Sequence, residues 1–199
     1  MEKRYSEQSA EVKKQLEQLK TNGKAKEELI VIKRSRSEVK AGDIFAIQHK
    51  SGMYFYGKVL NADVKYMRED GFYVIAIFKN SSINLSLDNL KLDYEQLLIP
   101  ICLDDKRCWT SGYFYTLYSG PLTQEEKKLD YGFFNPADGK YYRENNIELN
   151  YQPKVLGIYG IGSYRNIDYK IAIELIISPN LIESNNVKID MMKEKRKSA

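Results

Sequence analysis

Residues able to perform acid–base or nucleophilic chemistry are few and far apart in this 199-residue chain. His49 is the single histidine and adjoins Lys50-Ser51-Gly52 in a predicted hairpin loop, where we expect an exposed imidazole with no catalytic partner. Asp104-Asp105 and Glu125-Glu126 are adjacent acidic pairs of the kind that loops usually expose to solvent. We therefore predict that the protein is not an enzyme, and we assign no catalytic residue.

The sequence carries no metal or cofactor signature. Cys102 and Cys108 are separated by five residues, a spacing that matches no common zinc or redox motif, so we expect structural thiols. One histidine and two cysteines cannot complete a closed Cys/His metal site. Gly157, Gly160 and Gly162 lack the spacing of a dinucleotide-binding loop and are better suited to turns. The prediction is no metal and no cofactor.

The aromatic content of 16 Tyr, 7 Phe and 1 Trp suits both packing on a sheet and a binding surface, and for the five aromatic residues of the stretch described next both roles stay open. Tyrosine combines a large apolar face with a polar tip, which suits protein interfaces. Five aromatic residues lie in a polar, loop-rich stretch between Pro121 and Asn150, and two acidic residues before it are suited to steering a basic partner. The predicted partner-binding residues are Asp104, Asp105, Tyr131, Phe133, Phe134, Tyr141 and Tyr142. For Trp109 and its neighbours Tyr113 and Phe114, we expect core packing.

Charge is distributed unevenly along the chain. The net charge is +4 over residues 1–42, −3 over residues 43–187 and +3 over residues 188–199. Because a nucleic-acid-binding domain usually concentrates its basic residues on the folded face, this distribution weighs against nucleic acid as the main ligand. No apolar run reaches 18 residues, and the charged N-terminus has no apolar signal region behind it, so we expect a cytoplasmic protein without a membrane span.

Three regions are predicted from composition and periodicity. Residues 1–38 form a helical N-terminal arm, in which helical spacing runs to about residue 33 with an interruption at Thr21-Asn22-Gly23. Residues 39–187 form a single α+β domain, and residues 188–199 form a disordered basic tail.

Within the domain, period-two patterns predict strands at residues 44–47, 53–60 and 72–78, which pair consecutively in antiparallel fashion. Gly57 indicates a bulge or a close backbone approach in the second strand. The resulting fold class is α+β, with a mainly antiparallel, curled and barrel-like β-sheet.

The second half of the domain has weaker patterns. Strands are predicted at residues 97–101, 109–118 and 154–159, with Pro100 confining the first to a sheet edge or a bulge. A turn at residues 135–139 separates two aromatic pairs. Residues 163–177 fit both a strand and a helix face, and Ser163 as a cap with Pro179 as a stop favours a C-terminal helix.

Four segments follow each other in a characteristic order: Gly42 to Ile47, Tyr56 to Leu60, Leu97 to Pro100 and Trp109 to Phe114, with Pro121-Leu122 after them. Together they resemble the immunity protein 26 family of bacterial polymorphic toxin systems. The resemblance covers residues 40–178. It implies a non-catalytic α+β protein that binds a cognate toxin domain in the cytoplasm of the producing cell and blocks it.

The N-terminal arm departs from the family pattern, because members commonly begin close to the Gly42 segment. The arm's role stays open between homo-oligomerisation, regulation and a part in the inhibitory surface. The resemblance implies neutralisation of a toxin by occlusion. The alternative is a small β-barrel interaction module that binds nucleic acid through its basic arm and tail.

Overall fold

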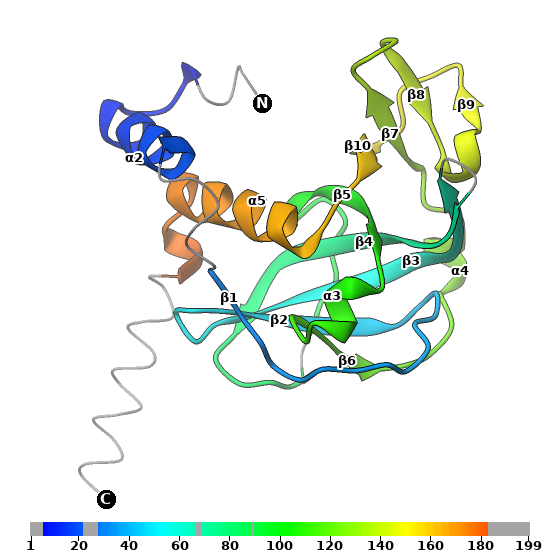
Figure 1. The fold of residues 1–199 in the computed structure, drawn as a ribbon, viewed down its shortest axis with the longest axis horizontal. Coiled ribbons are helices and arrows are strands. Elements are labelled where there is room, and N and C mark those ends of the chain that lie inside the picture. The colour runs from blue at the N-terminus through cyan, green and yellow to red at the C-terminus, as the bar shows by residue number, and fades with distance from the viewer. Residues whose placement is uncertain (1–5, 22–27, 67–68, 89, 183–199) are drawn as a thin grey trace, which may run out of the picture.

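The computed structural model describes residues 6–21, 28–66, 69–88 and 90–182. The predicted tail at 188–199 and Asn22-Gly23 of the predicted interruption lie outside these ranges. The α-helices discussed below are α2 (Ala10–Thr21), α3 (Arg107–Thr110), α4 (Gln124–Lys127) and α5 (Tyr164–Ile177), and a 3-10 turn, η2, spans Glu144–Asn146 (Figure 1).

In the described residues, ten strands form one open sheet. They are β1 (Leu29–Ile30), β2 (Ile44–His49), β3 (Tyr54–Tyr66), β4 (Glu69–Ser82), β5 (Leu97–Asp105), β6 (Phe114–Tyr118), β7 (Tyr131–Asn135), β8 (Lys140–Tyr142), β9 (Glu148–Leu149) and β10 (Val155–Ile161). Their order is β1-β2-β3-β4-β5-β10-β7-β8-β9, and β6 pairs with β2. The predicted α+β class with a mainly antiparallel, curled sheet is confirmed, although the sheet does not close into a barrel.

Strands β2, β3 and β4 are consecutive and antiparallel, as the period-two pattern predicts. Gly57 lies at a register shift between β3 and β4, and a Cβ atom there would overlap the ring of Phe45. The prediction of a bulge or a close backbone approach at Gly57 is therefore confirmed. Pro100 also lies at a register shift, where Ile75–Cys102 and Ile77–Ile99 are successive pairs of β4 and β5.

Alternate residues of the long strands bury side chains on both faces of the sheet. On β4, Tyr73, Ile75 and Ile77 belong to one core cluster, and Val74, Ala76 and Phe78 belong to the other. Helix α5 covers the first face through Ile167, Ile171 and Leu175, which recur every four residues. The Ser163 side chain accepts the backbone N–H of Asn166, so the predicted capped helix is confirmed.

Trp109 lies in helix α3, and the prediction of a strand over residues 109–118 is wrong for its first half. The carboxylate of Asp105 accepts the backbone N–H of Arg107 at 2.7 Å, which turns the chain into a helical turn directly after β5. The indole is 1% exposed, packs edge-on against Phe45 and Phe114, and donates its N–H to Thr116. The expectation that this tryptophan belongs to the core is confirmed.

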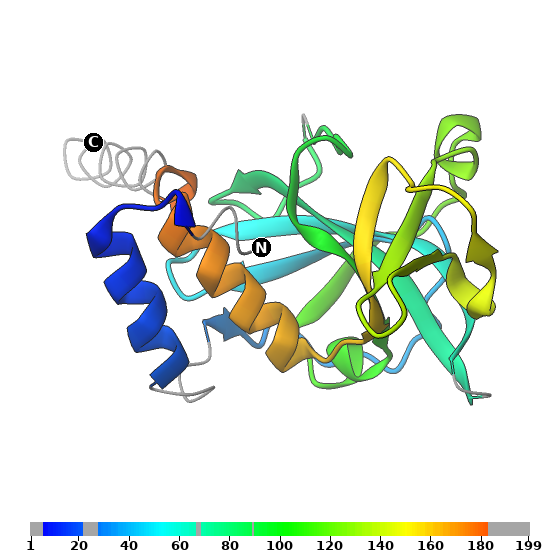
Figure 2. The same cartoon turned by 90° about the horizontal axis from the view of Figure 1, so that it is seen from above.

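The N-terminal arm lies against its own domain. Helix α2 packs beside α5, which both views show (Figures 1 and 2), and its Leu16 is buried. Leu29 and Ile30 were expected in the helical region but form strand β1, because the edge of β2 offers them hydrogen-bonding partners. The Asp168 carboxylate of α5 accepts the backbone N–H groups of Glu28 and Leu29, each at 3.0 Å. The arm is therefore held by a charged group far from it in sequence.

Replacing Asp168 with alanine should loosen this attachment, because two backbone N–H groups lose a charged acceptor in a buried setting. We expect a loss of about 2–3 kcal/mol in the free energy of unfolding. Hydrogen exchange at the amides of residues 28–30 should also accelerate. Glu17→Ala on the exposed side of α2 is the control and should change stability by less than about 0.5 kcal/mol. Unchanged protection of residues 28–30 in Asp168→Ala would contradict the assignment.

Candidate partner-binding surface

The structure brings five of the seven predicted partner-binding residues together and leaves two apart. Tyr131, Phe133 and Phe134 lie on β7, and Tyr141 and Tyr142 lie on β8, in one hairpin turned at residues 135–139. Asp104 and Asp105 lie at the end of β5, on the other side of β10 in the strand order (Figure 1).

The two faces of this hairpin have different environments. Tyr131 and Phe133 are 5% and 0% exposed and belong to the second core cluster, so their side chains serve the interior. Tyr142 lies against Tyr159 and donates its hydroxyl to Asp138 at 2.8 Å. Only Phe134 among the three β7 aromatics points to the face opposite that core.

Phe134 is the centre of a row of half-exposed apolar side chains on this opposite face. The register pairs Phe134 with Ile158 on one side and with Tyr141 on the other, and pairs Tyr141 with Leu149. Ile158 is 42% exposed, and the Phe134 and Tyr141 rings are 5.5 Å apart. We call Ile158, Phe134, Tyr141 and Leu149 the aromatic row.

Sequence reasoning missed Ile158 and Leu149. Both faces of β10 carry apolar residues, so its period-two pattern has no polar side that would mark the exposed face. Leu149 lies in a two-residue strand, which is too short to show any period. Only the register of the sheet places these two side chains beside Phe134 and Tyr141.

A buried carboxylate attaches the β7–β9 strands to the rest of the molecule. Glu144 is 8% exposed and accepts the hydroxyl of Tyr131 and the amide of Asn61, both at 2.7 Å, and Nε of Arg143 at 3.2 Å. Burial acts to raise the pKa of Glu144, but these hydrogen bonds outweigh it and the pKa is lowered. Burial, with the nearby Glu144, raises the pKa of Tyr131. Tyr131 is thus an anchor of the surface.

Asp104 is fully buried, so its side chain cannot steer a partner from this position. Burial raises the pKa of Asp104 to about 6, against an opposing hydrogen bond from the backbone N–H of Asp105. Asp105 is more accessible, but both its oxygens bind Arg107, whose Nε lies 2.6 Å from Oδ2. Its charge is therefore largely balanced within the chain.

His49 was expected to be exposed, and this expectation is wrong. The imidazole is 4% exposed at the end of β2, with Nδ1 2.8 Å from the Ser51 hydroxyl and Nε2 3.1 Å from the Glu28 carboxylate. The arm covers it, which the hairpin pattern alone could not reveal. Burial lowers the pKa of His49, with Glu28 acting in the opposite direction.

The two cysteines are free and buried, as a structural role requires. Burial raises the pKa of both thiols, which disfavours the nucleophilic thiolate. Among the described residues, no three His, Cys, Asp or Glu side chains gather closely enough to hold a metal ion. In the same residues, no helix is both long and apolar enough to cross a bilayer.

Comparison with known proteins identifies a family. A family model described as Immunity protein 26 matches residues 40–143, a little over half of the chain. The matched segment runs from the turn before β2 to the end of β8 and includes the β7–β8 hairpin. No curated protein and no solved structure matches the chain.

Replacing Glu144 with alanine should release the β7–β9 strands, because Tyr131 and Asn61 lose their shared buried acceptor. We expect a loss of about 2–3 kcal/mol in the free energy of unfolding, and faster hydrogen exchange in β7 and β8 than in β3. Glu148→Ala removes an exposed carboxylate that pairs with Lys140 on neighbouring strands, and should cost less than about 1 kcal/mol. Equal effects of the two substitutions would contradict the anchoring role.

Asp104 should make stability fall as the pH rises. Because its pKa is raised in the folded protein, its contribution is fully present below pH 3.8, the ordinary pKa, and is lost as the pH rises through about 6. Asp104→Asn cannot ionise and keeps an acceptor for the Asp105 N–H. At pH 7.5 its free energy of unfolding should therefore exceed that of the wild type by about 2–3 kcal/mol.

Chemical denaturation at pH 4 and pH 7.5 tests this, with the exposed Asp63→Asn as control. At pH 4 the Asp104→Asn variant and the wild type should differ little. A gain of the same size at both pH values would show that the substitution acts through packing and not through ionisation.

Proposed function

Because the chain belongs to the immunity protein 26 family, we propose that it protects the producing cell by binding a cognate toxin domain and covering the toxin's active face. The observation that carries this proposal is the family match over residues 40–143. The protein acts in the cytoplasm of a bacterium that also makes the toxin, and neutralisation needs no covalent step and no cofactor.

The aromatic row is the surface that we assign to toxin binding. Phe134, Tyr141, Leu149 and Ile158 present a contiguous, uncharged and half-exposed strip. Aromatic side chains at the centre of a surface contribute most of the affinity in many protein interfaces. The Glu144 anchor holds this strip in place before binding, so little conformational entropy is lost when a partner docks.

The chemistry of the remaining candidates also favours binding over catalysis. His49 is buried and hydrogen-bonded at both ring nitrogens, and the pKa of each thiol is raised. Tyr142 pairs with the core-facing Phe133 and Asp105 lies across β10 from the hairpin, so neither belongs to the proposed surface.

Co-expression tests the proposal. The partner is the C-terminal domain encoded by the open reading frame beside this gene, which should be toxic alone and harmless together with this protein. The two proteins should elute as one stoichiometric complex. Charged substitutions in the strip, Phe134→Asp with Tyr141→Asp, should weaken the complex at least tenfold and abolish protection.

Tyr118→Asp is the matched control, because Tyr118 is 49% exposed on β6, which pairs with β2 and not with the β7–β9 strands. It should protect as the wild type does. Circular dichroism and thermal unfolding must show that each variant is folded. Persistent toxicity in the presence of the folded wild-type protein would contradict the proposal.

A further inference from the structure

The strands that carry the aromatic row contain equal numbers of basic and acidic residues. Residues 131–158 include three of each, so their net charge is zero. The six charged residues are Asp138, Lys140, Arg143, Glu144, Glu148 and Lys154. The positions of these side chains decide whether a partner that docks on the row meets a charged or an uncharged surface.

Two of the six side chains form an ion pair on the face away from the row. Lys140 lies two residues before Tyr142 on β8, and Glu148 is opposite Tyr142 on β9. Because alternate residues of a strand point to opposite faces, both side chains lie on the side away from Tyr141 and Leu149. Lys140 Nζ is 2.9 Å from Glu148 Oε1. The sheet itself therefore separates this ion pair from the row.

Three more charged side chains are held by groups that face away from the row. The guanidinium carbon of Arg143 lies 3.9 Å from the centre of the Tyr131 ring, which belongs to the second core cluster. Nε of Arg143 is 3.2 Å from the Glu144 carboxylate. Asp138, in the turn between β7 and β8, accepts the hydroxyl of Tyr142 at 2.8 Å. Five of the six charges are therefore engaged away from the row.

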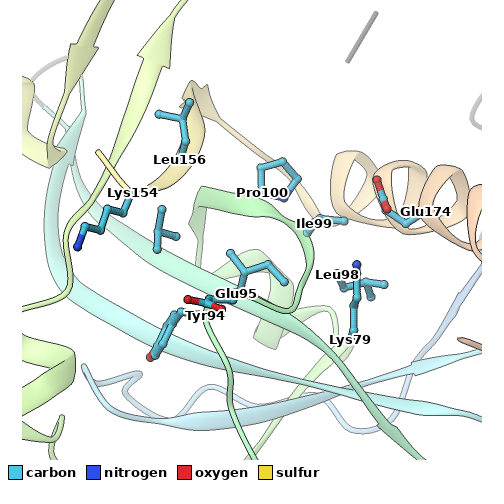
Figure 3. A pocket seen from close by; sticks show the side chains of 11 residues that line it. Lys79, Tyr94, Glu95, Leu98, Ile99, Pro100, Lys154, Leu156 and Glu174 are labelled. Carbon is cyan, nitrogen blue, oxygen red and sulfur yellow. The ribbon is translucent and has the colours of Figure 1, made fainter. Parts of the chain in front are cut away.

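The sixth residue, Lys154, lies at one end of the row, where the charges are balanced. It lines a cavity of about 400 Å³ between β5 and β10, and Leu156, on the same face of β10 as Ile158, connects this cavity with the row (Figure 3). The cavity has two charged side chains of each sign: Lys79, Lys154, Glu95 and Glu174. The nearby Asp130 carboxylate accepts the Tyr151 hydroxyl and the backbone N–H of Lys154, both at 3.1 Å. This end of the row therefore favours neither an acidic nor a basic partner.

Apolar side chains also form the base and the flanks of the row. Gly132 lies on the row's side of β7, where a Cβ atom would be 2.7 Å from the Pro153 ring and 3.1 Å from Leu149. Glycine thus lets the chain after β9 pack directly on β7. Ile147 and Tyr151 precede and follow β9 in the chain, and both are exposed. The uncharged surface is therefore wider than the four residues of the row.

We propose that the face of the toxin domain covered by the row is itself uncharged and largely apolar. This inference rests on the proposed function. A charged group of the toxin buried against the row would lose its hydration without gaining an opposite charge. An apolar face would instead be stabilised by burial against Phe134, Tyr141 and Ile158. The complex then forms without electrostatic steering, in contrast to the role predicted from the sequence for Asp104 and Asp105.

Charges of both signs placed at one position of the row test the inference. Ile158→Glu and Ile158→Lys should each raise the Kd for the domain encoded by the adjacent gene about tenfold or more, and by similar factors, because neither charge meets a partner. The uncharged Ile158→Gln should weaken binding less. Tyr118→Glu and Tyr118→Lys on β6 are the matched controls and should change the Kd less than about twofold.

The salt dependence of the wild-type complex is a second readout. Its association rate constant should be about 10⁵–10⁶ M⁻¹ s⁻¹, the range without steering, and should change less than about threefold between about 0.05 and 0.5 M NaCl. Circular dichroism must show that the Ile158 variants are folded. Tyr141→Glu and Tyr141→Lys repeat the comparison at a second position of the row.

Opposite effects of glutamate and lysine at Ile158, or an association rate that falls steeply with salt, would overturn the inference and leave the proposed function intact. Wild-type affinity in all charged variants of Ile158 and Tyr141 would also overturn it, because the row would then lie outside the contact. Absence of any complex with the wild-type protein would overturn the proposed function, and the inference with it.

Discussion

The backbone contact between Ile101 of β5 and Gly157 of β10 makes one sheet out of two groups of strands. Strands β2 to β5 follow each other in the chain, and β7, β8 and β9 form a second antiparallel group. Strand β10 lies between the groups and pairs in parallel with both. Since a side chain at Gly157 would meet the Ile101 carbonyl and the Phe133 ring, glycine is required where the groups join.

Three buried or half-buried carboxylates fix the parts that lie around this sheet. Asp168 holds the N-terminal arm, Glu144 holds the β7–β9 strands, and Glu126 holds α4 through Lys58, whose Nζ lies 2.6 Å from it. Burial disfavours the charge of Glu126, but the Lys58 hydrogen bond and the helix cap outweigh it and lower the pKa. Each carboxylate binds donors distant in sequence, so each peripheral element has one defined position.

Local patterns in the sequence were sufficient for much of the fold. Alternation predicted β2 to β4, and Ser163 with Pro179 predicted α5, because these signals act within a few residues. His49 was misjudged because its environment comes from the distant Glu28, whereas the helical turn that contains Trp109 was missed although the Asp105–Arg107 hydrogen bond that begins it is local. For the candidate surface, the aromatic residues of the sequence identified the hairpin but not the side chains that face outward. Phe133 and Phe134 are consecutive, and only the pairing with β10 decides which one faces the core.

The segment shared with the family ends at Arg143, before β10 and α5 begin. A fragment limited to the shared segment would therefore lack the strand that joins its two halves and the helix that covers one face. Its β5 and β7 edges would be free to pair with other chains, a common origin of aggregation. The packed structure thus extends past the segment that matches the family model. A shortened or grafted version of this protein should therefore end after Ile177.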